Sequence, residues 1–189
     1  MSQEKQVLRR TLRARRLLLS QQPERCEALI AHLLTLLSEC MKTPQGVLGF
    51  YMALPGEVEV TAALTQWAKV HRQRLALPYV EKSNRSMHYR LWREGDPLCP
   101  DTAGILAPLG EPIQPQVVLA PCVGYARGPL FRLGNGGGYF DRWLAASREQ
   151  VSTIGLAFEE LAVDPALFEP FDIPMDWVVT ECSCLSAHQ

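Results

Sequence analysis

A run of glycines between two arginines is the part of this sequence best suited to binding an anion. Glycines occupy four of five consecutive positions, Gly134, Gly136, Gly137 and Gly138. Because glycine has no Cβ and is costly to order, such a run is typical of places where the backbone approaches a ligand closely. A helical pattern follows the run, so its N–H groups and the helix dipole together predict an anion site.

Charged side chains next to the run narrow the chemistry. Arg132 and Arg142 can pair with phosphate oxygens, and Asp141 offers a hard oxygen ligand suited to Mg²⁺. The run is not a P-loop, because no Gly-Lys-Ser/Thr follows, and Tyr139 stands where the dinucleotide-binding motif needs a glycine. The residues by themselves predict a generic phosphate site, and a flexible surface loop is the alternative interpretation.

Alternating helical and strand patterns surround this site. Apolar residues at helical spacing predict helices over 3–19, 24–40, 60–71, 139–147 and 161–168. Short apolar runs bounded by Pro and Gly predict strands over 47–52, 74–80, 87–92, 116–120, 152–158 and 177–180. The second of these is expected to end near Pro78, and residues 93–115 read mostly as loop.

This alternation predicts one α/β domain over residues 1–189. The expected architecture has three layers, α/β/α, with a mainly parallel, Rossmann-like sheet between helices. In such folds ligands bind beyond the carboxyl ends of the strands, where loops lead into helices. The glycine run occupies such a position in the chain.

The composition is that of a globular protein. The chain has 189 residues, of which 47% are hydrophobic and 21% charged, and a net charge of −1 that favours neither nucleic acid nor membrane. No apolar stretch approaches the roughly 18 residues of a spanning helix, and the start lacks a secretory pattern, so we expect a cytoplasmic protein. The six cysteines lack metal-ligand spacing and are expected to be reduced thiols. We expect a monomer or a weak dimer.

The stretch from Arg132 to Arg142 resembles a known family signature. The 5-formyltetrahydrofolate cyclo-ligases have a pattern close to R-L-G-x-G-G-G-Y-Y-D-R, and Phe140 in place of the second Tyr is the one variation here. Residues 77–80 resemble the family's L-P-x-V, residues 155–158 its G-x-A-F, and residues 172–181 its closing D-x-x-x-D-x-x-x-T-E. The resemblance implies MgATP-dependent cyclisation of 5-formyltetrahydrofolate to 5,10-methenyltetrahydrofolate, with release of ADP and phosphate.

The resemblance also implies a nucleotide and metal site. Lys5 and Arg9 match an N-terminal K-x-x-x-R segment that contacts ATP, and they share one helix face. A solvated basic face is the alternative. Asp141 and Asp172 are the metal candidates, although Asp172 could instead cap a turn. The remaining ATP candidates are Arg132, Gly134, Asn135, Gly136, Gly137, Gly138, Tyr139 and Phe140.

The reduced folate is expected to bind after the first strand. The resemblance gives Met52 and Glu57 contacts with the folate, and a carboxylate there could accept the N–H donors of a pterin ring. Met52 could equally belong to the core, and Glu57 could cap the next helix. The glycines 136–138 and Tyr139 are expected to contact the folate too, and Arg132 and Tyr139 are the catalytic candidates.

Two alternatives stay open at this stage. Tyr125-Ala126 stands where the family commonly has Phe-Asp, the loop at 127–131 is slightly longer, and 85–115 matches poorly. A relative that binds ATP or folate without turnover would fit these departures. A sugar-phosphate isomerase or CoA-transferase-like α/β enzyme is the other alternative, but no convincing set of catalytic Glu, Lys or Asp residues supports it.

Overall fold

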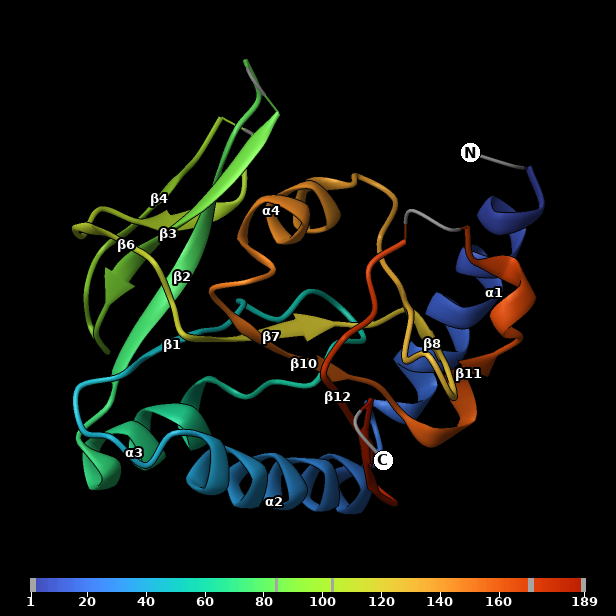
Figure 1. Ribbon diagram of the computed structural model, residues 1–189, viewed down its shortest axis with the longest axis horizontal. Coiled ribbons are helices and arrows are strands. Elements are labelled where there is room, and N and C mark those ends of the chain that lie inside the picture. The colour runs from blue at the N-terminus through green and yellow to red at the C-terminus, as the bar shows by residue number, and fades with distance from the viewer. Residues whose placement is uncertain (1–2, 84, 103, 170–171, 188–189) are drawn as a thin grey trace.

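An eight-stranded sheet forms the middle of the computed structural model (Figure 1), which describes residues 3–83, 85–102, 104–169 and 172–187. Its strands are β1 (Val47–Gly49), β2 (Arg74–Glu81), β3 (Ser86–Trp92), β6 (Pro112–Ile113), β7 (Val117–Pro121), β10 (Ser152–Leu156), β12 (Trp177–Val179) and β13 (Cys184–Ser186). They lie in the order β13-β12-β10-β7-β1-β2-β3-β6. The run from β12 to β2 is parallel, and β13, β3 and β6 pair antiparallel at the edges. The predicted mainly parallel sheet is confirmed.

Helices cover both faces of this sheet. Figure 1 shows α2 (Pro23–Cys40) and α3 (Thr61–His71) on one face and α4 (Tyr139–Ser147) on the other. The remaining helix, α1 (Gln3–Leu19), lies beyond the end to which the β7 arrow points, which is the carboxyl edge of the parallel strands (Figure 1). All four helices begin within one residue of their predicted starts.

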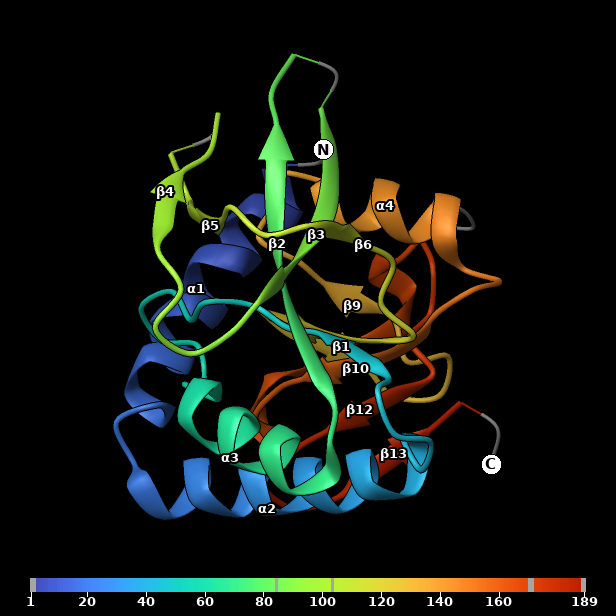
Figure 2. The ribbon, with the colours of Figure 1, turned by 90° about the vertical axis from the view of Figure 1, so that its left-hand side faces the viewer.

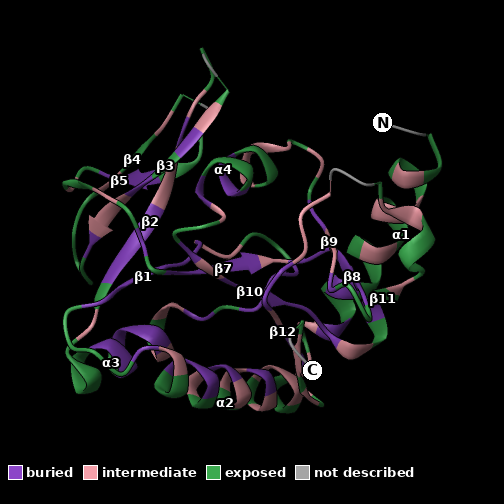
Figure 3. Ribbon diagram, in the orientation of Figure 1, coloured by how far each residue is buried: buried purple, intermediate pink, exposed green. Residues whose placement is uncertain are grey.

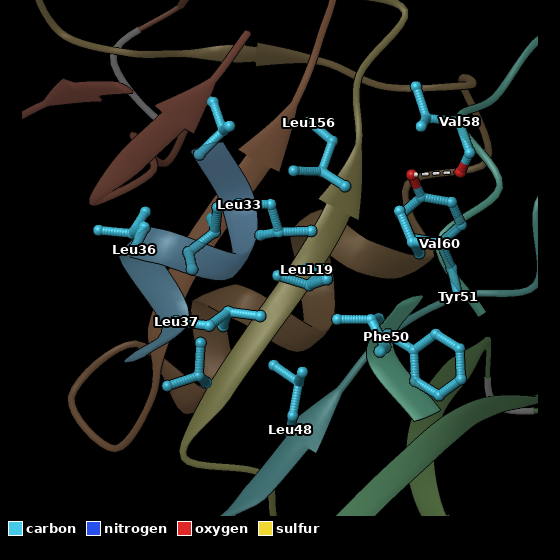
Figure 4. Close-up of a cluster of buried hydrophobic side chains, with 14 of the residues drawn as sticks. Leu33, Leu36, Leu37, Leu48, Phe50, Tyr51, Val58, Val60, Leu119 and Leu156 are labelled. Carbon is cyan, nitrogen blue, oxygen red and sulfur yellow. Dashed lines mark hydrogen bonds between the residues drawn. The ribbon is translucent and has the colours of Figure 1, made fainter. Parts of the chain in front are cut away.

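Successive residues of the central strands pack into two hydrophobic clusters, one on each face. Leu48 and Leu119 belong to the cluster under α2 and α3, whereas Val47 and Val118 belong to the cluster under α4. Side chains of a strand alternate between its faces, so a short apolar run fills both layers. Figure 3 shows the helices buried toward the sheet and exposed on the other side. In Figure 4 the sheet leucines lie near those of α2, Leu33, Leu36 and Leu37.

Two smaller sheets lie beside the central one. One joins β11 (Ala162–Val163), β8 (Gly124–Ala126) and β9 (Arg132–Leu133), and the other pairs β4 (Leu98–Pro100) with β5 (Leu106–Pro108). The prediction that 93–115 is mostly loop was therefore incomplete, because β4, β5 and β6 lie within it. These short strands are set by distant pairing partners, which a local pattern does not reveal.

The helix predicted over 161–168 was wrong. The segment instead holds β11 between two 3₁₀ turns, Glu159–Leu161 and Pro165–Leu167. Ala162 pairs with Tyr125, so long-range strand pairing replaces helical bonding there. Proline at 165 can begin a helical turn but cannot continue one, and the Asp164 side chain accepts a hydrogen bond from Ala166 N instead.

The second strand, predicted over 74–80 with an end near Pro78, is confirmed to within one residue, because β2 continues past this proline to Glu81. Phe50 N donates to Ala76 O across the edge shared with β1, and Pro78 comes two residues later on that edge. β1 has ended by then, so the missing proline N–H removes no bond between β1 and β2. Figure 2 shows β2 and β3 projecting beyond β1 as a long hairpin.

Candidate active site

A pocket of about 210 Å³ opens between the β2–β3 hairpin and the glycine run. It lies where β1 and β7 end, the edge at which the fold predicts ligands. Its apolar walls include Met52, Pro78, Val80, Met87, Tyr89, Ile105, Leu106, Leu119 and Tyr139. Its polar groups are Glu57, Asp101, Arg132, Asn135 and Asp141. One cavity therefore adjoins both the expected folate residues and the glycine run.

Backbone conformation explains why the run needs glycine. Gly136 and Gly138 have φ values of 97° and 67°, which residues other than glycine rarely adopt. Gly138 is the N-cap residue of α4 and no side chain caps the helix, so the first-turn N–H groups are available to an anion. At Gly134 a Cβ would lie 2.4 Å from Arg132 Nη1, so only glycine leaves room for that guanidinium.

Arg132 is held at the centre of this loop. Its side chain is 6% exposed, Nη1 donates to Pro121 O at 3.4 Å, and Nη2 donates to the exposed Asp141 carboxylate. The Arg132 Cζ atom lies 4.6 Å from the centre of the Phe140 ring. The variation at 140 thus keeps the flat surface against which the guanidinium stacks.

Arg142 connects the glycine run to the hairpin. It donates to Gly137 O at 3.3 Å and to Arg85 O at 3.2 Å, and its Cζ lies 5.0 Å from the Tyr139 ring centre. The Tyr139 ring therefore lines the pocket with a cation beside it. The expected part of Arg142 in phosphate binding stays a prediction.

Two arginines of α1 donate hydrogen bonds to the backbone of the glycine run. Arg9 Nε donates to Gly134 O at 3.0 Å, and Arg13 Nη2 donates to Asn135 O at 2.5 Å. Burial, followed by repulsion from Arg13, lowers the pKa of Arg9 below its ordinary value. An arginine nevertheless stays protonated, so the loop keeps two cations beside its carbonyls.

Both metal candidates lie close enough to Arg9 to affect its pKa. The negative charges of Asp141 and Asp172 each raise the pKa of Arg9, against the lowering by burial. Asp172 also lies 3.8 Å from Lys5 Nζ, which in turn donates to Glu169 at 3.4 Å. Within the described ranges, no group of three or more His, Cys, Asp and Glu side chains could hold a metal ion. A magnesium ion needs only one or two carboxylates when phosphates supply other oxygens, so this donor set fits one.

Glu57 is buried and faces the pocket with three partners. Its Oε1 accepts from Asn135 Nδ2 at 3.2 Å and lies 3.3 Å from Arg16 Nη1. Its Oε2 accepts from Leu54 N at 3.0 Å. The Asn135 side chain thus points to the expected folate side, while its carbonyl accepts from Arg13.

The sequence analysis did not single out three groups of residues in or beside the pocket. Arg13 and Arg16 of α1 form the first group, in which Arg13 contacts the glycine run and Arg16 is buried. Their spacing from Arg9, four and seven residues, is that of one helix face and would have identified them. The second group is Pro78, Val80, Met87 and Tyr89, whose sequence indicated only strands. The third group is Asp101, Ile105 and Leu106, which lie in the region that matches the family pattern poorly.

The β4–β5 hairpin is attached to β2 by side chains. Asp101 accepts from Val80 N at 2.8 Å and from Ile105 N at 3.0 Å. Thr102 Oγ1 accepts from Lys82 N and donates to Val80 O, both at 2.7 Å. These bonds cover the edge of β2 beyond the end of β1, and they bring Ile105 to the pocket rim.

The Tyr125-Ala126 departure lies away from this pocket. Both residues are buried in β8, and neither is among the described residues that line the cavity. The Tyr125 hydroxyl donates to Glu159 at 3.3 Å. Burial, and then the Glu159 charge, raise the pKa of Tyr125 to about 12.

The described helices also include none with the length and apolarity that crossing a membrane requires. Comparison with curated proteins found no match. Among solved structures, 5,10-methenyltetrahydrofolate synthetase from Aquifex aeolicus is similar, with a TM-score of 0.78 and 26% identity over 98% of this chain and 93% of that one. A second, from Mycoplasma pneumoniae, shares the fold with a TM-score of 0.71 and 22% identity over 94% of this chain and 98% of that one.

The family model adds evidence independent of geometry. The model described as the 5-formyltetrahydrofolate cyclo-ligase family matches residues 1–181, nearly the whole chain. The match includes α1, the glycine run and the closing segment. This chain belongs to the 5-formyltetrahydrofolate cyclo-ligase family.

Proposed function

We propose that this protein closes 5-formyltetrahydrofolate to 5,10-methenyltetrahydrofolate with MgATP, releasing ADP and phosphate. The observation that carries the proposal is the composition of one pocket. An apolar cavity with a buried carboxylate acceptor, Glu57, adjoins a glycine run and Arg132. A folate and a polyphosphate can therefore meet in the same place, which ring closure by phosphoryl transfer requires. Family membership supports the same activity.

The folate side of the pocket suits a flat, partly polar ring. Met52 and Tyr89 offer apolar surface, and the Glu57 carboxylate offers acceptors for pterin N–H donors. The glycines 136–138 allow the ligand to approach the backbone, and Tyr139 forms an adjacent wall. These residues orient the formyl group toward the glycine run.

The nucleotide side suits a chelated polyphosphate. The uncapped N-terminus of α4 and the backbone of 134–138 bind phosphate oxygens, and Lys5, Arg9 and Arg132 neutralise their charge. Asp141 and Asp172 would hold Mg²⁺, which would neutralise phosphate charge there. ATP supplies the phosphoryl group that turns the formyl oxygen into a leaving group, after which folate N10 closes the ring. The protein contributes position and charge, as is usual for phosphoryl transfer.

The Asp141→Ala variant tests the metal role. We expect turnover to fall on the order of 100-fold. The reason is that the metal loses a carboxylate ligand and then stabilises the charge of the transferred phosphoryl group less well. The thermal midpoint should change little, since Asp141 is 55% exposed. The measurement is the ultraviolet absorbance of the methenyl product formed from 5-formyltetrahydrofolate, ATP and Mg²⁺.

Glu149→Ala is the matched control, because this carboxylate is exposed just after the end of α4. It should retain wild-type turnover. Unchanged Mg²⁺-dependent turnover in Asp141→Ala would exclude the metal role. A wild-type protein that binds both ligands and forms no product would instead support a binding relative.

The alternative of a relative that binds ATP or folate without turnover rested on Tyr125-Ala126. These two residues are not among the described residues that line the pocket. The sugar-phosphate isomerase or CoA-transferase alternative loses its support with the family match.

A further inference from the structure

Arg16 is an arginine enclosed by protein. Its side chain is 5% exposed, and that of Glu57 is 2% exposed. Arg16 Nη1 lies 3.3 Å from Glu57 Oε1 and donates to Cys122 O at 3.1 Å. Arg16 is not among the described residues that line the candidate pocket, whereas Glu57 is, so Glu57 connects Arg16 to a ligand there.

Two other titratable groups close to Glu57, those of Tyr51 and Cys122, are neutral. Tyr51 follows β1, and burial, with the Glu57 charge second, raises the pKa of its hydroxyl well above the ordinary value. Cys122 follows β7, and burial raises the pKa of its thiol to about 12. Arg132 pairs with Asp141. Among the described residues, Arg16 is therefore the cation in contact with the Glu57 carboxylate.

Stability alone does not account for this pair. A buried ion pair loses so much hydration that an apolar pair of similar volume is often equally stable. The geometric consequence of the pair is specific, because Arg16, Asn135 and Leu54 N together use three of about four acceptor positions of the carboxylate. The carboxylate is thus held in one orientation at the pocket wall.

We propose that Arg16 is a positioning residue for the folate pocket, which holds the Glu57 carboxylate so that its remaining acceptor position, on Oε2, binds a pterin N–H donor. This inference rests on the proposed function of the site. Arg16 belongs to the same helix as Arg9 and Arg13, but it acts on the folate side, whereas they contact the glycine run. Its loss should affect the folate far more than ATP.

The Arg16→Met variant tests this role. At pH 7.5 we expect KM for 5-formyltetrahydrofolate to rise about tenfold or more, with KM for ATP changed less than about threefold. The turnover number should change much less than the folate KM, because Arg16 does not touch the reacting atoms. Arg16→Lys, which keeps the positive charge, should show a smaller increase in folate KM.

A double-mutant cycle with Glu57→Gln separates positioning from general damage. If Arg16 acts through Glu57, adding Arg16→Met to Glu57→Gln should change folate KM less than about twofold. Arg10→Met is the matched control, because Arg10 is exposed on the same helix, and it should behave as wild type. An unchanged folate KM in Arg16→Met, an equal rise for ATP, or fully additive effects in the cycle would overturn the proposal.

Two further measurements, on the Arg16→Lys variant and on folate binding without turnover, complete the test of the role of Arg16. If Arg16→Met does not fold, Arg16→Lys decides, and a wild-type folate KM in that variant contradicts the inference. Equilibrium binding of 5-formyltetrahydrofolate, measured by calorimetry, does not depend on turnover. A wild-type protein without product contradicts the proposed function, whereas tight folate binding that Arg16→Met leaves intact contradicts only the role of Arg16.

Discussion

At the scale of single residues, the two aspartates of the closing segment have different surroundings. Asp172 is partly exposed and lies 3.8 Å from Lys5 Nζ. Asp176 is buried and accepts hydrogen bonds from Thr153 N at 2.8 Å, Thr153 Oγ1 at 2.9 Å and Arg148 Nη1 at 2.9 Å. Although burial alone would raise the pKa of Asp176, these bonds, that from Arg148 foremost, lower it below the ordinary value. Asp176 therefore stabilises the joint between β10 and the segment before β12.

Asp176→Asn should lower the free energy of unfolding by about 2 kcal/mol at pH 7, because charged hydrogen bonds are lost. A depressed carboxyl pKa contributes stability above the unfolded-state value and loses it as pH falls through the folded one. The difference from wild type should thus shrink below about pH 4. Urea unfolding from pH 3 to 7 measures it. Asp96→Asn, at an exposed turn, should stay within about 0.5 kcal/mol, and a pH-independent difference would contradict this account.

At the scale of elements, the start of α4 depends on backbone that only glycine tolerates. Gly138 has a φ of 67°, and a Cβ there would lie 2.8 Å from Arg142 Nη1. Gly128 has a φ of 83° with no atom within 4 Å of a Cβ. The two positions share the backbone strain and differ in what surrounds them.

Gly138→Ala and Gly128→Ala should each destabilise the fold by roughly 1–2 kcal/mol, the cost of a left-handed residue with a Cβ. Gly138→Ala should also raise KM for ATP on the order of tenfold, because it displaces Arg142 and the N–H groups at the start of α4. Gly128→Ala should leave the kinetics unchanged. Equal kinetic effects in the two variants would show that lost stability, not the local geometry, controls activity.

At the scale of the whole molecule, the small β11-β8-β9 sheet holds the glycine run against the ends of β7 and β10. β9 carries Arg132 at its start, and β8 carries Tyr125 on its partner strand. Glu159 accepts hydrogen bonds from the Tyr125 hydroxyl and from Thr180 Oγ1, which join this sheet to the end of β12. The departure from the family at 125 thus belongs to the support of the site. A single domain over 1–189 stays a prediction.

Tyr125→Phe should accordingly leave folate KM within about twofold of wild type. Loss of its hydrogen bond to Glu159 should lower the free energy of unfolding by about 1 kcal/mol. Steady-state kinetics and urea unfolding of the same preparation measure the two effects. A tenfold change in folate KM would show that position 125 shapes the pocket.

Several features could be predicted from the sequence because their cause is local. Helical periodicity located α1, α2, α3 and α4, and the glycine run before Tyr139 indicated where α4 begins. The family pattern identified candidates from Lys5 to Asp172 that lie around one pocket or beside it. These signals depend on residue type and spacing along a few turns of chain.

The tertiary structure alone decided how distant segments complete the site. Arg16 and Arg15 are neighbours of the same type, yet Arg16 is buried against Glu57 and Arg15 pairs with Glu160 at the surface. The pocket wall over 101–106 depends on Asp101 reaching Val80 across β2. A local pattern reports which residues favour burial but not which partner buries them, because burial and strand pairing arise from contacts between residues far apart in sequence.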